Sequence, residues 1–369
     1  MEIGGVVNNH LVDYPMPGSI NYLWGLGSMS GIMLVVQIST GVFLAMHYKV
    51  GVGTAWASVE HIMRDVNGGW ILRYVHANGA SMFFIVVYIH IARGLYHGSY
   101  ERPREGLWWI GIGIFLLMII TAFIGYVLPW GQMSFWGATV ITSMVEVIPG
   151  VGGEILGWLW GGYGVSEPTL GRFYALHYLL PFVIAALALV HIIVLHIDGS
   201  TNPVGGKGDK ITFYPYAYVK DLTVWMGIVI GMTMIVIYEP NMLGHPVNYE
   251  EASEIVTPEH IVPEWYFLPF YAILRSVESK LGGVILMVGA IVILGVLPGR
   301  GEVRTSRYRP MMEGAYWNLI GTVIMLGWLG GKVAEEPYVT VSRIMTVNYF
   351  ITMIGIMSMG GLEKRIMRR

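Results

Sequence analysis

The stretch HANGASMFFIVVYIH runs from His76 to His90, and it carries no Lys, Arg, Asp or Glu. At 3.6 residues per turn, the fourteen positions that separate the two histidines make about 3.9 turns of α-helix, so both imidazoles would lie on one face. A rise of about 1.5 Å per residue would place them about 21 Å apart, within a hydrocarbon core of about 30 Å. The stretch therefore predicts a membrane-spanning helix that presents imidazoles at two depths.

The same spacing returns in HYLLPFVIAALALVH, from His177 to His191. We expect the two helices to cross in the same direction, so that His76 lies level with His177, and His90 with His191. Two facing imidazoles at each depth suit two stacked low-spin haems, whose iron passes electrons without binding oxygen. Histidines that only make packing hydrogen bonds are the alternative, and two pairs with one spacing argue against it.

The composition is that of a membrane protein. Of the 369 residues, 54% are hydrophobic and only 12% are charged, whereas soluble domains are about a quarter charged. A net charge of −2 gives no basis for binding nucleic acid. The absence of cysteine excludes disulfides, thiolate metal sites, cysteine-ligated iron–sulfur clusters and covalent c-type haem within the chain. We expect no cleavable targeting peptide, because no basic region followed by an apolar core opens the sequence.

Segments without charged residues locate the membrane crossings, and they occupy residues 14–48, 74–92, 106–145, 173–197, 222–238, 281–299, 314–331 and 344–362. A crossing needs about 20 residues. The third segment has room for two, but LPWGQ at 128–132 breaks it, so we expect 133–145 to lie at the membrane surface. The sequence therefore predicts an all-α polytopic membrane protein of eight transmembrane helices, the first four forming a bundle around two haems.

Eight crossings place both termini on one side of the membrane. That side carries 14 of the 22 Lys and Arg residues, so the positive-inside rule assigns it to the negative, matrix or cytoplasmic, face. The opposite face carries residues 239–280, a segment rich in Pro, Glu and aromatic residues. A loop of this length seldom serves only to connect two helices.

Residues near the histidines also fit a haem. Arg73 and Arg93 bracket the second span, where each can pair with a propionate near one membrane face, although interfacial anchoring would explain them too. Glycines repeat the fourteen-residue spacing in the first and third spans: Gly27 with Gly41, and Gly111 with Gly125. They would let a flat macrocycle approach the backbone at the same two depths. Helix packing through small residues is the alternative.

With the paired histidines, the segments GYVLPWGQMSFWGATVIT (125–142) and PEWYFLPFYAILRS (263–276) resemble the cytochrome b family of ubiquinol–cytochrome c oxidoreductase, respiratory complex III. The resemblance covers nearly the whole chain. It implies two non-covalent b-type haems with bis-histidine ligation. His76 and His177 would hold a low-potential haem near the positive side, and His90 and His191 a high-potential haem near the negative side.

The resemblance also implies a quinol-oxidation pocket beside the low-potential haem. Glu264 supplies a carboxylate that can accept a proton from ubiquinol, and we take Glu264 and Tyr266 as the catalytic residues. A Pro-Glu pair that merely opens a helix is the alternative for Glu264. The pocket would be lined by Phe123, Tyr126, Met133, Gly137, Ile141, Pro263, Phe267 and Tyr271.

A quinone-reduction pocket is implied on the negative side by LHIDGSTNP (195–203) and YVKDL (218–222). His196 and Asp221 would bind the two sides of ubiquinone, and Ser200, Phe213 and Lys220 would line the pocket. An interfacial His–Asp pair without a ligand is the alternative. Where many relatives carry Asn after the first-span Trp, this chain has Gly25, which would remove a polar contact near this site.

The activity implied is a bifurcated oxidation. One electron of ubiquinol would go to a Rieske iron–sulfur protein and the other through both haems to ubiquinone, contributing to the proton gradient. The partners implied are that protein, a cytochrome c1-type subunit, additional complex III subunits and membrane lipid, in a dimeric complex. We expect the mitochondrial inner membrane rather than a bacterial plasma membrane, with both termini in the matrix. The domains expected are 1–210, which binds haem, and 211–369, which carries the quinol-oxidation loop.

Two alternatives stay open. The homologous plastoquinol–plastocyanin oxidoreductase normally splits after four spans and spaces its second histidine pair one residue wider, whereas this chain is fused and has fourteen at both pairs. A non-catalytic haem-binding or transport membrane protein is the other alternative, and it would not require the two quinone motifs.

Overall fold

A computed structural model describes residues 4–5, 8–206, 208–298 and 305–367. Gly299, the end of the sixth expected span, lies outside the described residues. So do five of the basic residues behind the predicted orientation: Lys207, Arg300, Arg304, Arg368 and Arg369.

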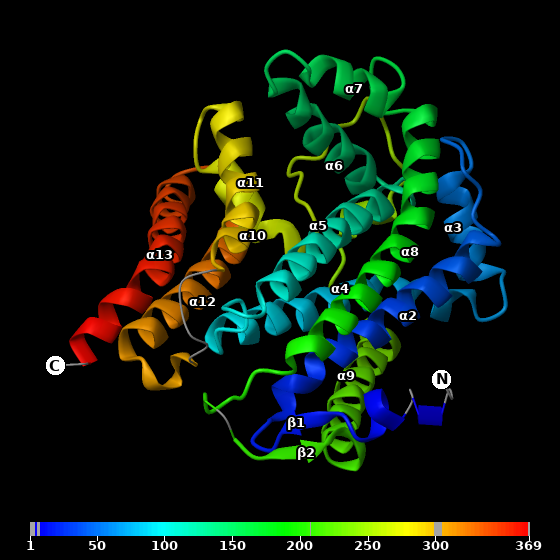
Figure 1. Ribbon diagram of the computed structural model, residues 1–369. Helices are drawn as coiled ribbons and strands as arrows, with labels where there is room; N and C mark the ends of the chain where they lie inside the picture. Colours follow the sequence, from blue (N-terminus) through cyan, green and yellow to red (C-terminus); the bar gives the residue numbers. More distant parts are fainter. Residues whose placement is uncertain (1–3, 6–7, 207, 299–304, 368–369) are drawn as a thin grey trace.

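Four long helices form the centre of the molecule: α2 (Leu26–Ala45), α4 (Gly69–Tyr96), α5 (Glu105–Val127) and α8 (Glu167–Asp198). α2 packs along α4 and α5 packs along α8 (Figure 1). Each is an apolar helix that satisfies its own backbone hydrogen bonds, as a crossing of hydrocarbon requires. Buried side chains such as Met29, Met33, Phe84 and Phe115 fill the space between them.

The remaining long helices are α9 (Tyr218–Tyr238), α11 (Lys280–Val296), α12 (Pro310–Gly330) and α13 (Tyr338–Met367). α12 packs along α13, and the short α10 (Leu268–Arg275) packs against α11 and α12. α9 instead joins the first bundle, where it contacts α4 and α2. The predicted domain boundary at 210/211 precedes α9 and remains a prediction.

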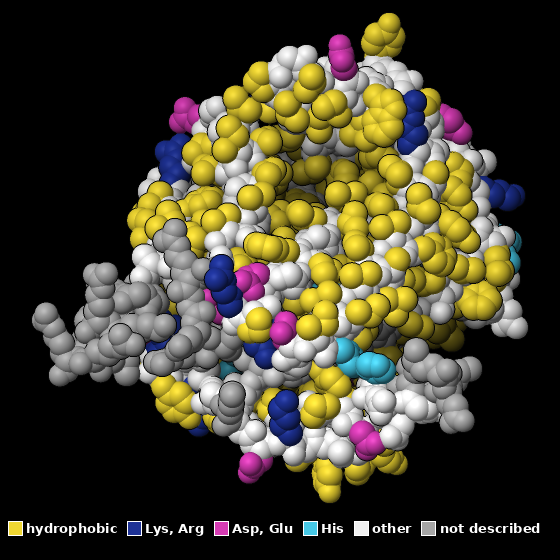
Figure 2. Space-filling model, in the orientation of Figure 1, with side chains coloured by type: hydrophobic (Ala, Val, Ile, Leu, Met, Phe, Trp, Pro, Cys, Tyr) yellow, Lys and Arg dark blue, Asp and Glu magenta, His cyan; other side chains and the backbone are white. Residues whose placement is uncertain are grey.

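Membrane spans are recognised by length and hydropathy. Among the described residues, six helical segments meet both criteria: 22–45, 69–96, 105–127, 167–198, 213–238 and 338–358. α11 is a shorter apolar helix of 17 residues and α12 has 21 residues. Large apolar side chains are exposed on the outside of the helices; Ile193, Ile230 and Ile324 are 58–68% exposed. Hydrophobic side chains also cover most of the middle of the face in Figure 2. The predicted polytopic helical membrane fold is confirmed.

Short elements occupy the two ends of the bundle. α6 (Gln132–Ser143) and α7 (Gly152–Trp160) lie at the top of Figure 1, and the β1–β2 pair lies at the bottom. The strands β1 (Pro15–Pro17) and β2 (Lys210–Thr212) are antiparallel, with Met16 opposite Ile211. The other short elements are η1 (Asn8–Val12), η2 (Tyr22–Gly25), α3 (Ala55–Arg64), η3 (Met144–Val147), η4 (Phe213–Ala217), η5 (Pro246–Tyr249), η6 (Trp265–Phe267) and η7 (Ser306–Tyr308).

The break at LPWGQ is a docking point for the long segment that begins at residue 239. α5 ends at Val127, and Trp130 takes a left-handed φ of 58° before α6 begins. The Gln132 amide donates to the Glu250 carbonyl at 3.0 Å, and the Ala252 amide donates to the Trp130 carbonyl at 3.0 Å. The long segment therefore does more than connect two helices, because it fixes the turn that leads into α6.

Candidate functional site

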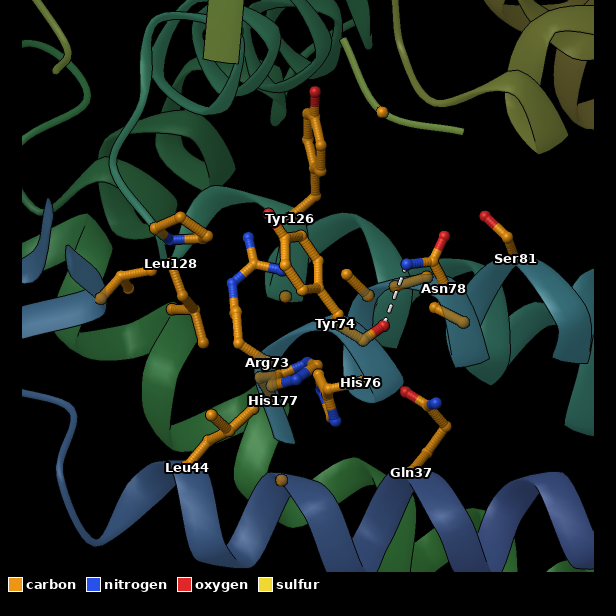
Figure 3. A pocket seen from close by; sticks show the side chains of 18 of the residues that line it. Gln37, Leu44, Arg73, Tyr74, His76, Asn78, Ser81, Tyr126, Leu128 and His177 are labelled. Atoms are coloured by element: carbon orange, nitrogen blue, oxygen red, sulfur yellow. Dashed lines mark hydrogen bonds between the residues drawn. The ribbon is translucent and has the colours of Figure 1, made fainter. Parts of the chain in front are cut away.

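The first pair of level histidines faces across the bundle. The ring centres of His76 on α4 and His177 on α8 lie 6.2 Å apart, with ring planes at 83°, and the two rings appear together above α2 in Figure 3. A metal–nitrogen bond is about 2.0 Å long, and the centre of an imidazole lies about 1 Å further, so two rings that ligate one metal from opposite sides stand about 6 Å apart. The observed separation is that of a bis-histidine metal site.

Hydrogen bonds at Nδ1 direct the other nitrogen of each ring toward this space. His177 Nδ1 donates to the Thr121 carbonyl at 2.8 Å. The Thr40 hydroxyl donates to the Val36 carbonyl at 2.7 Å, so its oxygen is free to accept from His76 Nδ1 at 2.9 Å. Both rings then have Nε2 without a proton, which is the form that ligates a metal. The sequence analysis missed Thr40 and Thr121.

Each of the four histidines lies against one of the four glycines. A Cβ at Gly41 would meet His76 Cε1 at 3.1 Å, and one at Gly125 would overlap the His177 ring. At the other depth, a Cβ at Gly27 would meet His90 Cε1 at 3.2 Å and one at Gly111 would meet His191 Cε1 at 3.2 Å. The glycines of α2 and α5 thus leave room for the edges of the imidazoles, and each ring is held between its own helix and a neighbour.

Gly125→Ala should therefore loosen or lose the cofactor at the His76–His177 depth while leaving the other depth intact. The added methyl cannot fit beside the His177 ring, and overpacking of this kind costs about 1–3 kcal/mol. The measurement is the reduced-minus-oxidised absorption spectrum of the purified protein, with the cofactor content of each depth followed by its own redox component. Gly113→Ala, on the same helix with nothing within 4 Å of its Cβ position, is the control. A spectrum of Gly125→Ala identical to that of the control would contradict the packing role.

A cavity of about 740 Å³ surrounds His76 and His177 and continues to the 239–264 segment. It is within the 300–1,000 Å³ range of ligand and cofactor pockets. Figure 3 shows the Arg73 guanidinium reaching toward Tyr126 along one wall of this cavity, away from the two imidazoles. The lining also includes Gly41, Gly125, Glu264 and Tyr266.

At the other depth, buried hydrogen-bond donors lack partners. Arg93 Nη2 lies 3.0 Å from His90 Nδ1, and the Arg93 guanidinium stacks over Trp24 at 5.1 Å. Within the described ranges, Arg93 Nε and Trp24 Nε1 are buried with no hydrogen-bond partner, and no carboxylate is paired with Arg93. Buried donors of this kind fit an anionic group. The residues therefore fit a prosthetic group that carries acidic side chains, as haem does.

Glu264 lies on the wall of the large cavity, where α5 and the segment before α10 meet. Burial raises the pKa of its carboxyl to about 7, and the Tyr126 hydroxyl and the Arg73 guanidinium offset part of that rise. A carboxyl with a pKa near 7 can accept and release protons at neutral pH. Tyr126, Glu264 and Tyr266 of the predicted oxidation set all line this cavity.

The rest of the predicted oxidation set lies elsewhere. Gly137, Ile141, Pro263 and Tyr271 surround a second cavity of only about 10 Å³, about the space of one water. Three others are packed: Phe123 against Phe173, Phe267 against Phe84 and Tyr266, and Met133, which is 1% exposed. The structure therefore brings the set together in two adjoining groups. The sequence analysis missed Phe84, whose ring stacks on Tyr266 at 4.0 Å and 2°.

The predicted quinone-reduction residues border one cluster at the opposite end, formed by Tyr14, Met16, Ile20, Trp24 and Ala217. The His196 ring contacts Tyr14 at 4.2 Å, the Ser200 hydroxyl lies 3.6 Å from Met16 Sδ, and Phe213 packs on the cluster. Lys220 Nζ donates to the Ile20 carbonyl at 2.6 Å.

Asp221 is buried beside α2. It accepts a hydrogen bond from the Ser28 hydroxyl at 2.7 Å. A Cβ at Gly25 would meet Asp221 Oδ1 at 3.1 Å and Val224 at 3.2 Å. The lack of a side chain at Gly25 thus lets α9 approach the start of α2, and Ser28 supplies the polar contact to Asp221.

Comparison with known proteins gives one consistent result. Residues 11–199 match the family described as Cytochrome b/b6/petB, and residues 251–350 match Cytochrome b(C-terminal)/b6/petD. Cytochrome b of Chondrus crispus is 57% identical over 97% of this chain and 96% of its own length. Cytochrome b of Marchantia polymorpha is 56% identical over 98% and 90%. A solved structure described as hyperthermophilic respiratory Complex III superposes with a TM-score of 0.92 at 28% identity, over 98% of this chain and 97% of that one.

Proposed function

Because this chain belongs to the cytochrome b family and is the catalytic core subunit of quinol–cytochrome c reductase, complex III of the respiratory chain, we propose the residues that hold its haems and react with quinone. The chain is a multi-pass membrane protein that binds haem. We propose two b-type haems, one held by His76 and His177 and one by His90 and His191. When bound, the haems carry single electrons across the membrane. The observation that carries the proposal is the pairing of all four imidazoles with four glycines.

Arg73 and Arg93 are the proposed partners of the propionates. Arg73 lines the cavity around His76 and His177, and Arg93 lies beside His90 with a buried, unpartnered Nε. Each guanidinium would neutralise a carboxylate that is excluded from water, which strengthens their mutual attraction. Four glycines leave room for the edges of the imidazoles and so help to hold the ring orientations: Gly27, Gly41, Gly111 and Gly125.

Ubiquinol oxidation is proposed at the Glu264 end of the large cavity. The Glu264 carboxylate accepts a proton from the quinol hydroxyl, and Tyr266 and Tyr126 shape the pocket around the ring. Gly137, Ile141 and Tyr271 form a wall with Pro263, which directly precedes Glu264. This wall would widen as the quinol enters. We propose Phe123, Met133 and Phe267 as further apolar residues of the oxidation pocket.

Ubiquinone reduction is proposed at the opposite end. His196 binds one quinone carbonyl and Asp221 the other. The His196 imidazole is half-buried at the end of α8, and the Asp221 carboxylate is held by the Ser28 hydroxyl of α2. Ser200, Phe213 and Lys220 complete the pocket. Releasing protons at one end and taking them up at the other, while an electron crosses between, contributes to a proton gradient.

The proposed reaction also requires partner subunits and a particular membrane. The chain has no cysteine, so the iron–sulfur cluster and covalent haem of the pathway belong to other subunits. We propose a Rieske iron–sulfur protein, a cytochrome c1-type subunit and further subunits in a dimeric complex. The similarity to cytochrome b of two eukaryotes supports the mitochondrial inner membrane. We place the β1–β2 end of the bundle, and with it both termini, in the matrix.

A mixing experiment tests the bifurcated oxidation. If the two electrons of one quinol must separate, adding an oxidant to the complex with ubiquinol should make the b haems more reduced, not less. His196→Ala removes the proposed exit to ubiquinone, so the reduced haems should then persist. Glu154→Gln, a change at an exposed residue of α7 that lines neither cavity, is the control. Haems that become oxidised at once in every variant would contradict the proposal.

A further inference from the structure

The N-terminal segment lies on the end of α8 that carries His196. The ring centres of His10 and His196 are 5.3 Å apart with planes at 63°, and the Tyr14 ring contacts the same imidazole at 4.2 Å. His196 Nε2 also lies 3.4 Å from the His10 carbonyl. The motif LHIDGSTNP predicts one imidazole at this place, that of His196, and the structure adds a second, that of His10.

Several contacts fix this segment in place. The Phe213 amide donates to the Tyr14 carbonyl at 2.9 Å, and the Tyr14 hydroxyl lies 3.4 Å from the Leu195 carbonyl. β1, which follows directly, pairs with β2. Within η1, the Asp13 amide donates to the Asn8 carbonyl at 2.8 Å. His10 is thus carried on a segment that is anchored on both α8 and the β1–β2 pair.

The two imidazoles differ in their access to water. His10 is exposed, whereas His196 Nδ1 is engaged by the Ile192 carbonyl of its own helix at 2.8 Å. His196 therefore has only Nε2 available for exchange, and Nε2 is the nitrogen that faces the His10 backbone. Burial raises the pKa of the Tyr14 hydroxyl, so Tyr14 keeps its proton. The two imidazoles that meet here are then the groups left to pass a proton on.

We propose that His10 is a further residue of the quinone-reduction site, a relay that carries protons from water to His196. The inference rests on the proposed role of His196. Each quinone that is reduced takes up two electrons, delivered through the chain from quinol oxidation, and two protons from the negative side. In the relay step, the N–H bond of His196 breaks as an O–H bond forms on the quinone. His196 then takes a proton from His10, and His10 regains one from water.

The surroundings of the relay carry charges of both signs. Asp13 and Tyr14 lie on the same segment as His10, and Asp198 follows His196 on α8. Arg104 before α5 donates to the Gly199 carbonyl at 2.8 Å and to the Asp198 carbonyl at 3.3 Å. Arg104 therefore caps the end of α8 through two backbone carbonyls.

The test measures how fast the prereduced haems of the intact complex are reoxidised by a short-chain ubiquinone. His10→Ala should slow this step about tenfold near neutral pH and shift its pH profile, because general acid–base groups contribute at least this much. Added imidazole should restore the rate, since His10 is exposed, and a purely structural role would not respond to it. His61→Ala, an exposed histidine on α3 whose hydrogen-bond partner is Asp65, should behave as the wild type.

Two further variants separate the possible outcomes. If His10→Ala lowers haem content, the rate of His10→Gln decides instead. Glutamine keeps a polar side chain at the same place but cannot take up and release a proton. A wild-type rate and pH profile for His10→Gln or His10→Ala would overturn the relay. If His196→Ala is reoxidised normally as well, the proposed quinone-reduction site itself fails. If only the His196 variant is slow, the relay alone fails.

Discussion

Replacing His177 by leucine should remove one of two b-type haem components and reduce quinol–cytochrome c turnover to background. The His177 ring faces His76 at 6.2 Å, and no other imidazole is placed to replace it among the described residues of α5 and α8. Loss of even a residue that only supports a metal ligand weakens metal binding about 10–100-fold, so loss of the ligand itself should cost at least that much. The measurement is a redox titration of the purified complex, with haem quantified in parallel.

A nearby change provides the control. Thr121→Val removes a hydroxyl that donates to the Leu117 carbonyl but keeps the Thr121 carbonyl that accepts from His177 Nδ1. This variant should retain both haems. Two unchanged components in His177→Leu would show that His177 is not a ligand.

Glu264→Gln should have the second largest effect, with turnover reduced by about 10²–10⁴-fold while both haems remain. Glutamine has a similar shape but cannot accept a proton from the quinol. In the proposed reaction the carboxylate is the form that accepts the proton, and burial raises the pKa of Glu264 to about 7. The rate of quinol oxidation should therefore rise with pH through about 7, and this rise should be absent from the variant.

The matched control is Glu254→Gln, an exposed glutamate in the same long segment. It should keep the rate and the pH dependence of the wild type. Normal turnover in Glu264→Gln would rule out the carboxylate as the proton acceptor and move that role to another group in the cavity.

The helices and the level of the histidines could be predicted from spacing alone. Fourteen residues between His76 and His90, and between His177 and His191, fix the depth and the face of each imidazole on a straight helix. The repeated spacing of the glycines is explained by the structure: Gly41 and Gly125 meet the imidazoles of one depth, and Gly27 and Gly111 those of the other.

Other features depend on how separate elements meet, and sequence spacing does not report this. Thr40 and Thr121 sit in apolar helices as ordinary packing residues until the neighbouring helix brings an imidazole to them. A polar residue directly before Gly41 was the only signal for Thr40. His10 lies 186 positions from His196, and only the anchoring of the N-terminal segment brings the two rings together.

The sequence could not predict that the residues of the quinol-oxidation pocket would line two separate cavities. Both Tyr126 and Tyr271 were predicted to line the quinol-oxidation pocket. In the structure Tyr126 lines the large cavity and Tyr271 lines the small one. The reason is that Tyr271 lies on α10, where its hydroxyl donates to the Ile261 carbonyl at 3.2 Å and its ring lies under Arg275. Contacts of this kind are made by the folded segment and leave no pattern along the chain.

The central claim is that four histidines hold two haems at two depths of one bundle. A potentiometric titration of the purified complex, followed by b-type absorption, tests it most directly. We expect two one-electron components of equal amplitude with different midpoint potentials, which together correspond to two haems per chain. A single component, or no b-type absorption assigned to this subunit, would contradict it.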